Sequence, residues 1–347
     1  MKSIAAALAL LSGVIGAGFA SGREIVRFFA IHGRMAYASA GCALAMLAFL
    51  FLRLCSVLER SGCTTLDALC RIRFGRSFGR LCAGLFFVLC AVTGGAMLCA
   101  CAELGALLLP LRHAYALTMA CSLLAALVCA HRGMNGLALP GALLTALLPA
   151  LLLRLLFIQG GEACFLPAMA PDLPVRPAAD GAIYGALNAA MLAGMLPALL
   201  SLDAAARKRA VALFALLFGI LLLLGILVCR AHMPKIYMQP MPFVHLSRSL
   251  GKSGYLLLCA SMYAAAFSTL CAMLLGMQRL LPFSAKASLP VSAALCLFFA
   301  RIGFGPLVSS GYPVLGALCA GLLLALCLPG CPGRHSQNGQ PSKQPPI

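Results

Sequence analysis

Apolar runs of about 20 residues follow one another along almost the whole chain, and short segments rich in Arg, Lys, Pro and Gly separate them. A helix of about 20 apolar residues crosses the roughly 30 Å hydrocarbon core of a bilayer. The pattern therefore predicts an all-α polytopic membrane protein with about ten transmembrane helices. The expected spans are residues 4–30, 36–58, 80–109, 114–130, 136–158, 181–202, 210–229, 254–281, 288–307 and 312–328.

A Pro-rich stretch at 159–180 divides these spans into five and five. An odd number of spans makes the second half enter the membrane from the opposite side, so a repeat relating the halves would be inverted. We expect one transmembrane domain at 1–329, with repeats at about 4–158 and about 181–328. Residues 330–347 are rich in Pro, Gly, Ser and Gln and predict a disordered polar tail.

Composition excludes the soluble classes. The chain is 63% hydrophobic and 10% charged, whereas soluble domains average about 45–50% and about 25%. The net charge of +18 lies mainly between apolar runs, which indicates membrane orientation and lipid headgroups rather than nucleic acid. The dense basic clusters at 71–80 and 207–209 fall on the same side if the N-terminus is cytoplasmic, so we expect that orientation in the cell membrane.

Other classes lack their signatures. Most of the 18 cysteines lie inside apolar runs, where Cys is a small hydrophobe, and no zinc-type spacing with histidines occurs. No hydrolase or metalloprotease motif is present, so we do not expect an enzyme. Nothing in the sequence indicates an obligate protein partner.

The N-terminal segment has two interpretations. Residues 4–22 can be read as a cleaved signal peptide. The helical pattern resumes directly at residues 23–29, however, and glycines interrupt the apolar stretch. We therefore favour a retained first span.

Glycines at 13, 16, 18 and 22 stand in the middle of that first span. Each costs roughly 1 kcal/mol against Ala inside a helix, so the stretch favours unwinding, with main chain uncoiled at Gly16, Ala17 and Gly18. Uncoiled backbone at membrane depth is tolerated where it lines a cavity. Close helix packing through the Gly18–Gly22 spacing is the equally weighted alternative.

The first span of the second half carries comparable interruptions at Tyr184, Asn188, Gly194 and Pro197. Asn188 is a buried amide that must find hydrogen-bond partners, either a solute or a neighbouring helix. Paired interruptions in corresponding spans of two halves are typical of a transport site.

In span eight, Ala265, Ser268 and Thr269 stand at i, i+3 and i+4 and share one helix face. Their oxygens suit a hard cation. The alternative is that both hydroxyls donate to carbonyls of their own helix, which alone would be the commoner case.

The segment from Gly16 to Ile25, with Phe28 and Phe29 beyond it, resembles the first-span signature of the YkvI-type membrane proteins. That family belongs to the amino acid–polyamine–organocation transporter superfamily. The segment around Tyr184, the Ala265–Thr269 face and residues 312–316 are also similar, so the resemblance extends over about 4–328. The family usually has Gln where Arg23 stands here, which adds positive charge near the outer half.

The resemblance implies the LeuT-type five-plus-five fold with the first and sixth helices broken. Carried over by residue, a sodium ion would bind the carbonyls of Ser12, Ile15 and Ala265 and the hydroxyls of Ser268 and Thr269. The list of substrate contacts that it implies is Gly16, Ala17, Gly18, Asn188 and Thr269. Some relatives replace sodium with a lysine in span five, but residues 136–158 contain none.

Two acids are candidates for coupling or gating. Glu24 lies beside Arg23 and one turn from Arg27, so a local ion pair is its simplest interpretation. Glu103 lies within span three, where an ionisable group is a functional candidate by default. Pairing of Glu103 with Arg112 and exposure to an outer vestibule are equally weighted.

The sequence thus predicts a secondary active transporter of a small organic solute, an amino acid or similar zwitterion, coupled to sodium and working by alternating access. A receptor or sensor on the same fold is an alternative, because a fold does not determine function. Proton-coupled or uncoupled transport is another. No cofactor other than the coupling sodium ion is expected.

Overall fold

The computed structural model describes residues 2–132, 138–158, 175–280 and 285–328, and the described secondary structure is entirely helical. The all-helical prediction is confirmed. Within the described residues, seven helical segments are long and apolar enough to cross a membrane. Lys2–Val14, Leu147–Ile158 and Ser288–Ala300 are shorter apolar helices. The predicted tail at 330–347 and most of the Pro-rich stretch lie outside the described residues.

The helices of the first half overlap the first five expected spans. Their bounds are α1 Lys2–Val14, α2 Ala17–Ala20, α3 Arg23–Phe28, η1 Ala30–Met35, α4 Ala36–Ser61, α5 Leu66–Leu108, α6 Ala114–Arg132 and α7 Ala138–Ile158. α5 begins fourteen residues before the expected span because Gly75, at φ 81° and ψ 173°, joins an additional short helix to the spanning one.

The helices of the second half overlap the remaining expected spans. They are α8 Val175–Met191, η3 Leu192–Met195, α9 Leu196–Leu200, α10 Ala204–Ala231, α11 Pro242–Ser247, η4 Arg248–Leu250, α12 Gly251–Leu280, α13 Ala285–Ala300, α14 Phe304–Pro306, η5 Leu307–Gly311 and α15 Tyr312–Cys327. The expected ninth span is shorter than predicted, since α13 ends at Ala300 and Arg301 lies in the following turn.

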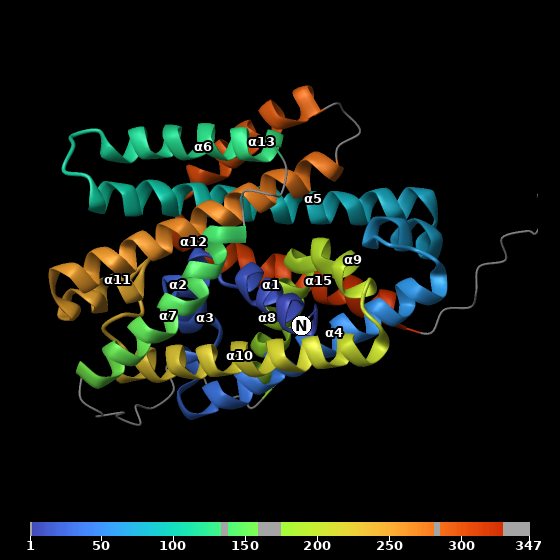
Figure 1. Cartoon of the computed structure of the whole chain (residues 1–347), viewed down its shortest axis with the longest axis horizontal. Helices are drawn as coiled ribbons and strands as arrows, with labels where there is room; N and C mark the ends of the chain where they lie inside the picture. Colours follow the sequence, from blue (N-terminus) through green and yellow to red (C-terminus); the bar gives the residue numbers. More distant parts are fainter. Residues whose placement is uncertain (1, 133–137, 159–174, 281–284, 329–347) are drawn as a thin grey trace, which may run out of the picture.

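The broken first segment lies inside the bundle. Figure 1 shows α1, α2, α3 and α8 in the middle, with α5, α6 and α13 on one side and α4 and α10 on the other. Glycines allow α8 to approach its neighbours closely. A Cβ on Gly181 would lie 2.1 Å from the carbonyl oxygen of Ser39, and one on Gly185 would lie 2.5 Å from that of Ala43. This small-residue spacing holds α8 against α4.

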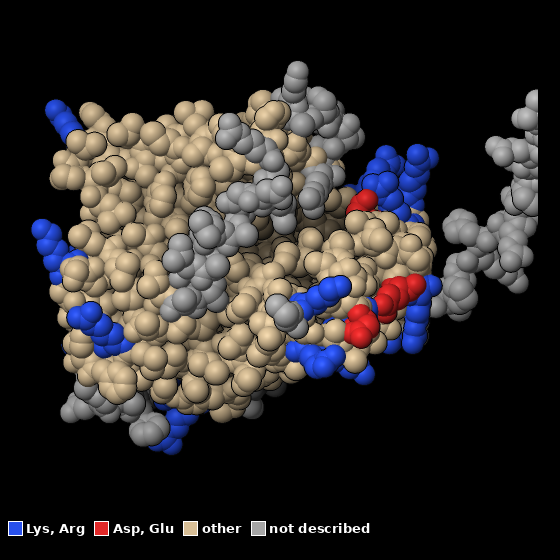
Figure 2. Space-filling model, in the orientation of Figure 1, with Lys and Arg blue, Asp and Glu red and all other residues tan. Residues whose placement is uncertain are grey.

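The basic clusters of the sequence meet at one end of the molecule. Figure 2 shows Lys and Arg gathered where α4 ends and α5 begins. Arg207, at the start of α10, donates to both carboxylate oxygens of Glu59 on α4, and its Nη1–Oε2 distance is 2.9 Å. The clusters at 71–80 and 207–209 are thereby brought to the same end, as the sequence predicts.

Candidate functional site

The helical path of the first segment is interrupted at Ile15 and Gly16. The amide of Gly16 donates to the carbonyl of Val14 at 2.8 Å, and the helical pattern resumes with the bond from Ala20 to Gly16 at 2.9 Å. The carbonyls of Ser12 and Ile15 therefore lack the i+4 donor that a continuous helix would supply. Carbonyls freed in this way, at the C-terminal end of α1, are suited to a cation.

The interruption is shorter than the sequence predicts. We expected uncoiled chain over Gly16, Ala17 and Gly18, but Ala17 and Gly18 belong to α2. The hydroxyl of Ser21 accounts for part of this difference, because it donates to the carbonyl of Gly18 at 3.0 Å and so supports the end of this short helix. The chain turns again at Gly22, whose φ of 81° favours glycine.

The expected break at Asn188 is not where the sequence places it. α8 remains helical through Tyr184 and Asn188 to Met191, and the irregular part is the tighter turn η3 that follows. The Nδ2 of Asn188 donates to the carbonyl of Tyr184 at 2.9 Å, which satisfies a donor of the buried amide without unwinding the helix. η3 nevertheless meets α1, since a Cβ on Gly13 would lie 2.4 Å from Cδ2 of Leu192.

On α12, the hydroxyls of Ser268 and Thr269 both donate to the carbonyl of Ala265, at 2.9 and 3.0 Å. This is the alternative arrangement from the sequence analysis, in which both hydroxyls donate to a carbonyl of their own helix. Thr269 is buried and faces the interruption, because a Cβ on Gly16 would lie 3.3 Å from its Oγ1. The structure thus brings Gly16 to Thr269, while Ser12 on α1 and Ser268 remain half-buried.

Glu24 is buried, with 5% of its surface exposed, and accepts a hydrogen bond of 2.9 Å from the hydroxyl of Tyr184 at Oε2. Its Oε1 lies against Gly18, where an added Cβ would come within 1.9 Å. Glu24 does not form the expected ion pair with Arg23 or Arg27. Arg23 is adjacent to Glu24 in the helix and points in a different direction. Arg27 is three residues away, within reach of Glu24, but its guanidinium binds Ser309 and Asp180 instead.

Arg23 and Arg27 bind other groups instead of Glu24. Nη2 of Arg23 donates to Oγ of Ser309 at 2.7 Å, and Nε of Arg27 donates to the carbonyl of Ser309 at 3.0 Å. Arg27 also lies 3.5 Å from Oδ2 of Asp180, which lies 3.0 Å from Nε2 of the buried His32. These contacts join α3 to α8 and to the π-helical turn η5.

Two buried hydroxyls next to this region, those of Thr93 and Tyr312, have no partner at hydrogen-bond geometry among the described residues. The hydroxyls of Thr93 and Tyr312 lie close to each other, and Tyr312 is close enough to Glu24 to interact electrostatically. A buried hydroxyl without a partner in a polar region is a candidate contact for a ligand or water. Thr93 was missed by the sequence analysis, although a hydroxyl followed by Gly94 and Gly95 in an apolar run is a signal for it.

Glu103 lies apart from this group. It is half-buried on α5, and Cys99 donates to its Oε1 at 3.4 Å. Arg112 is exposed in the turn after α5, and the ion pairs found among the described residues do not include it. Of the two equally weighted alternatives for Glu103, the pairing with Arg112 is therefore not seen in the structure.

No protein-family model matches the chain. It is 22% identical over 336 residues to the uncharacterized membrane protein YkvI of Bacillus subtilis (strain 168), a match that covers 93% of this chain and 94% of that protein. It superposes with a TM-score of 0.60 and 13% identity on a crystal structure of the Eremococcus coleocola manganese transporter, covering 94% of this chain and 78% of that one. The chain is a membrane protein with a transporter fold. Among the residues that the structure describes, no group of three or more His, Cys, Asp and Glu is placed to hold a metal ion.

Proposed function

We propose that the chain is a secondary active transporter of a small organic solute, an amino acid or similar zwitterion, working by alternating access. The observation that carries the proposal is the interruption at Ile15 and Gly16, which faces Thr269 inside the bundle. An interrupted helix in the interior of a membrane protein offers backbone groups of both signs to a solute. The fold shared with a solved transporter supports the same function.

We further propose the LeuT-type arrangement of ten spans in an inverted five-plus-five repeat, with a cytoplasmic N-terminus. The three short apolar helices, added to the seven longer segments, supply the required number within the described residues. The meeting of both basic clusters at one end supports the orientation, because short cytoplasmic loops carry excess Lys and Arg.

The proposed class of solute is argued from the predicted substrate contacts, of which Thr269 lies next to Gly16. Backbone groups of Gly16, Ala17 and Gly18, the amide of Asn188 and the hydroxyl of Thr269 are neutral and directional. They suit an organic molecule, and the Glu24 carboxyl beside Gly18 suits its ammonium group. The structural neighbour is named as a manganese transporter. That substrate is a property of the neighbour. We favour an organic solute here because the predicted contacts are neutral backbone, amide and hydroxyl groups, and because the acid found against Gly18 is Glu24.

Sodium is the proposed coupling ion, bound by the carbonyls of Ser12, Ile15 and Ala265 and the hydroxyls of Ser268 and Thr269. Oxygen ligands of this kind suit a hard cation, and the first two carbonyls lack their helical donors. Each hydroxyl keeps a lone pair for a cation while it donates to Ala265.

Proton coupling through Glu24 is the second candidate, and the burial of that carboxyl beside Tyr184 is the observation that favours it. An ionisable group inside a membrane protein is a functional candidate by default.

Uptake into reconstituted vesicles separates the two ions. The protein is reconstituted with an imposed sodium gradient or an imposed pH gradient of equal driving force, and uptake of radiolabelled amino acids is measured. Sodium coupling predicts accumulation only with the sodium gradient. Accumulation with the pH gradient alone, together with its loss in Glu24→Gln, would transfer the coupling to Glu24. No gradient-driven accumulation of any amino acid would contradict the proposed function.

A further inference from the structure

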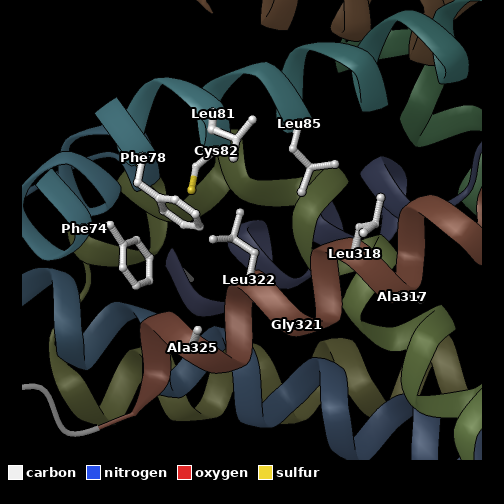
Figure 3. Close-up of a pocket in the computed structure, with 10 residues that line it drawn as sticks. All are labelled: Phe74, Phe78, Leu81, Cys82, Leu85, Ala317, Leu318, Gly321, Leu322 and Ala325. Carbon is white, nitrogen blue, oxygen red and sulfur yellow. The ribbon is translucent and has the colours of Figure 1, made fainter. Parts of the chain in front are cut away.

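An apolar hollow of about 620 Å³ lies between α5 and α15, away from the interruption at Gly16. Figure 3 shows the ten residues that line it. Gly321 has no side chain, and the other side chains are hydrocarbon apart from the thiol of Cys82. Phe78 and Leu85 enter it from α5, and Leu318 and Ala325 face them from α15. Phe78, Leu81 and Leu318 are 48–65% exposed, so the hollow is open to the surroundings of the bundle. In a membrane protein, those surroundings are lipid.

The dimensions of the hollow match part of a lipid tail. Its lining on α15 extends from Ala317 to Ala325, which spans about 12 Å at 1.5 Å per residue. The hydrocarbon of one leaflet is about 15 Å deep, half of the bilayer core. Gly321 lies within this stretch, and a Cβ added to it would meet open space. The hollow therefore has the length and chemistry for one acyl chain.

Two half-buried arginines stand at one end of this hollow. Nε of Arg53 donates to the carbonyl of Cys327 at 3.2 Å, and Nη2 of Arg73 donates to the carbonyl of Leu328. These carbonyls end α15 two to three residues beyond Ala325. Within the described part of the chain neither arginine forms an ion pair. Both keep N–H groups that can bind a phosphate.

The surrounding charges have the same sign. Arg76 and Arg80 are exposed on the face of α5 opposite Phe78, so they add to the positive field rather than contact the hollow. The nearby acids, Asp67 and Glu59, are already paired with Arg71 and Arg207. Figure 2 shows this end as strongly basic. An anionic headgroup is the complement that this end lacks.

We propose that the hollow binds one acyl chain of an anionic phospholipid, with the headgroup phosphate held by Arg53 and Arg73. Basic pockets between membrane helices on the cytoplasmic side are suited to such headgroups. The C-terminal residues 329–347 are a poorer match, because they carry Arg334 and Lys343 and no acid. The proposal does not depend on the transported solute or its coupling ion.

Native mass spectrometry of the purified full chain tests the site, with phosphatidylglycerol and phosphatidylcholine of identical acyl chains as probes. We expect phosphatidylglycerol to bind more tightly by roughly tenfold or more. The double variant Arg53→Gln, Arg73→Gln should lose this preference, and the Lys pair at the same positions should restore most of it. Arg112→Gln, an exposed arginine at the other end of α5, is the charge control and should bind like the wild type.

The acyl-chain part is tested by filling the hollow. Gly321→Leu should reduce binding of both lipids, whereas Gly84→Leu should not, because Gly84 also has open space but lies outside the hollow.

Equal binding of the two lipids by the wild type, or unchanged binding in Gly321→Leu, would overturn the proposal. A change of oligomeric state in Gly321→Leu would make the hollow an interface between copies instead. If millimolar inorganic phosphate displaces phosphatidylglycerol as effectively as added phosphatidylglycerol does, the site recognises phosphate alone, and the proposal of a lipid site is also overturned. If Gly321→Leu does not fold, the arginine variants still decide the result.

Discussion

The hydroxyl of Tyr184 on α8 donates a 2.9 Å hydrogen bond to Oε2 of Glu24 on α3. Both side chains are buried, and the ring of Tyr184 packs against Phe28 and Phe29 with centroid distances of 5.0 Å. The bond joins the first apolar segment to the first helix of the second half. A movement of α3 relative to α8 must therefore break or reorganise it, which makes the pair a candidate for sensing the state of the site.

Removing this donor should destabilise the protein. Tyr184→Phe keeps the ring but leaves a carboxyl group buried without its donor, which costs about 1–3 kcal/mol of unfolding free energy. Tyr312→Phe is the matched control, because Tyr312 is equally buried and its hydroxyl makes no hydrogen bond to Glu24. We expect this control to be neutral or slightly stabilising. Thermal unfolding in detergent measures both, and equal losses of stability would contradict the assignment.

The absence of a side chain at Gly18 should be equally important for the stability of the fold. A Cβ there would come within 1.9 Å of Oε1 of Glu24, so Gly18→Ala forces the carboxyl to move and should cost about 1–3 kcal/mol as overpacking does. Gly41→Ala is the control, since Gly41 is exposed on α4 with open space around it. That control should leave stability unchanged or raise it by up to about 1 kcal/mol. A harmless Gly18→Ala, seen in the same thermal assay, would show that Glu24 does not pack against α2.

The helices were predictable from the sequence because the bilayer imposes a length and a polarity on each span. The overlap of α4, α10 and α15 with their expected ranges follows from apolar length alone. The interruption at Gly16 was predictable because glycine weakens a helix. The prediction of a break at Asn188 was wrong in position, since the amide bonds to the carbonyl of Tyr184 within the same helix. The composition of a segment thus indicates where irregular backbone is tolerated, but the local hydrogen bonds determine which residue leaves the helix.

The partners within the site could not be predicted. Glu24 and Tyr184 are 160 residues apart, and the sequence shows only that each lies in an apolar segment. Which helices become neighbours depends on packing, such as the close approach of α8 to α4 through Gly181 and Gly185. The expected pairing of Glu24 with Arg23 or Arg27 also depends on packing, because Ser309 and Asp180, which come from distant segments, bind the two arginines instead.

Asp180 should stabilise the contact of α3 with α8 more than a surface ion pair does. Its Oδ2 lies 3.0 Å from Nε2 of His32 and 3.5 Å from Nη1 of Arg27, with 12% of the Asp180 side chain exposed. Asp180→Asn removes the charge, leaves two basic groups facing each other and should cost about 1–3 kcal/mol. Asp67→Asn is the control. It breaks the i,i+4 pair with Arg71, whose side chain is 59% exposed, and should cost about 0.5 kcal/mol or less. Chemical unfolding of both variants at pH 7 measures the difference, and an equal cost would show that the Asp180 group adds no more than a surface pair.

Sodium should stabilise the wild type and fail to stabilise Thr269→Val if the proposed cation site is correct. The substitution keeps the volume of the side chain but removes a hydroxyl ligand beside Gly16. At a concentration 100-fold above its dissociation constant, sodium contributes about 2.7 kcal/mol to a protein that binds it only when folded. Thr118→Val is the matched control, because Thr118 on α6 makes the same bond to the carbonyl four residues earlier, at 2.7 Å, and lies outside the site. Thermal unfolding is measured in sodium chloride and in choline chloride at equal ionic strength. A sodium-dependent shift that survives Thr269→Val unchanged would exclude this hydroxyl as a ligand. A wild type that responds equally to both salts would contradict sodium coupling and leave Glu24 as the candidate for energy coupling.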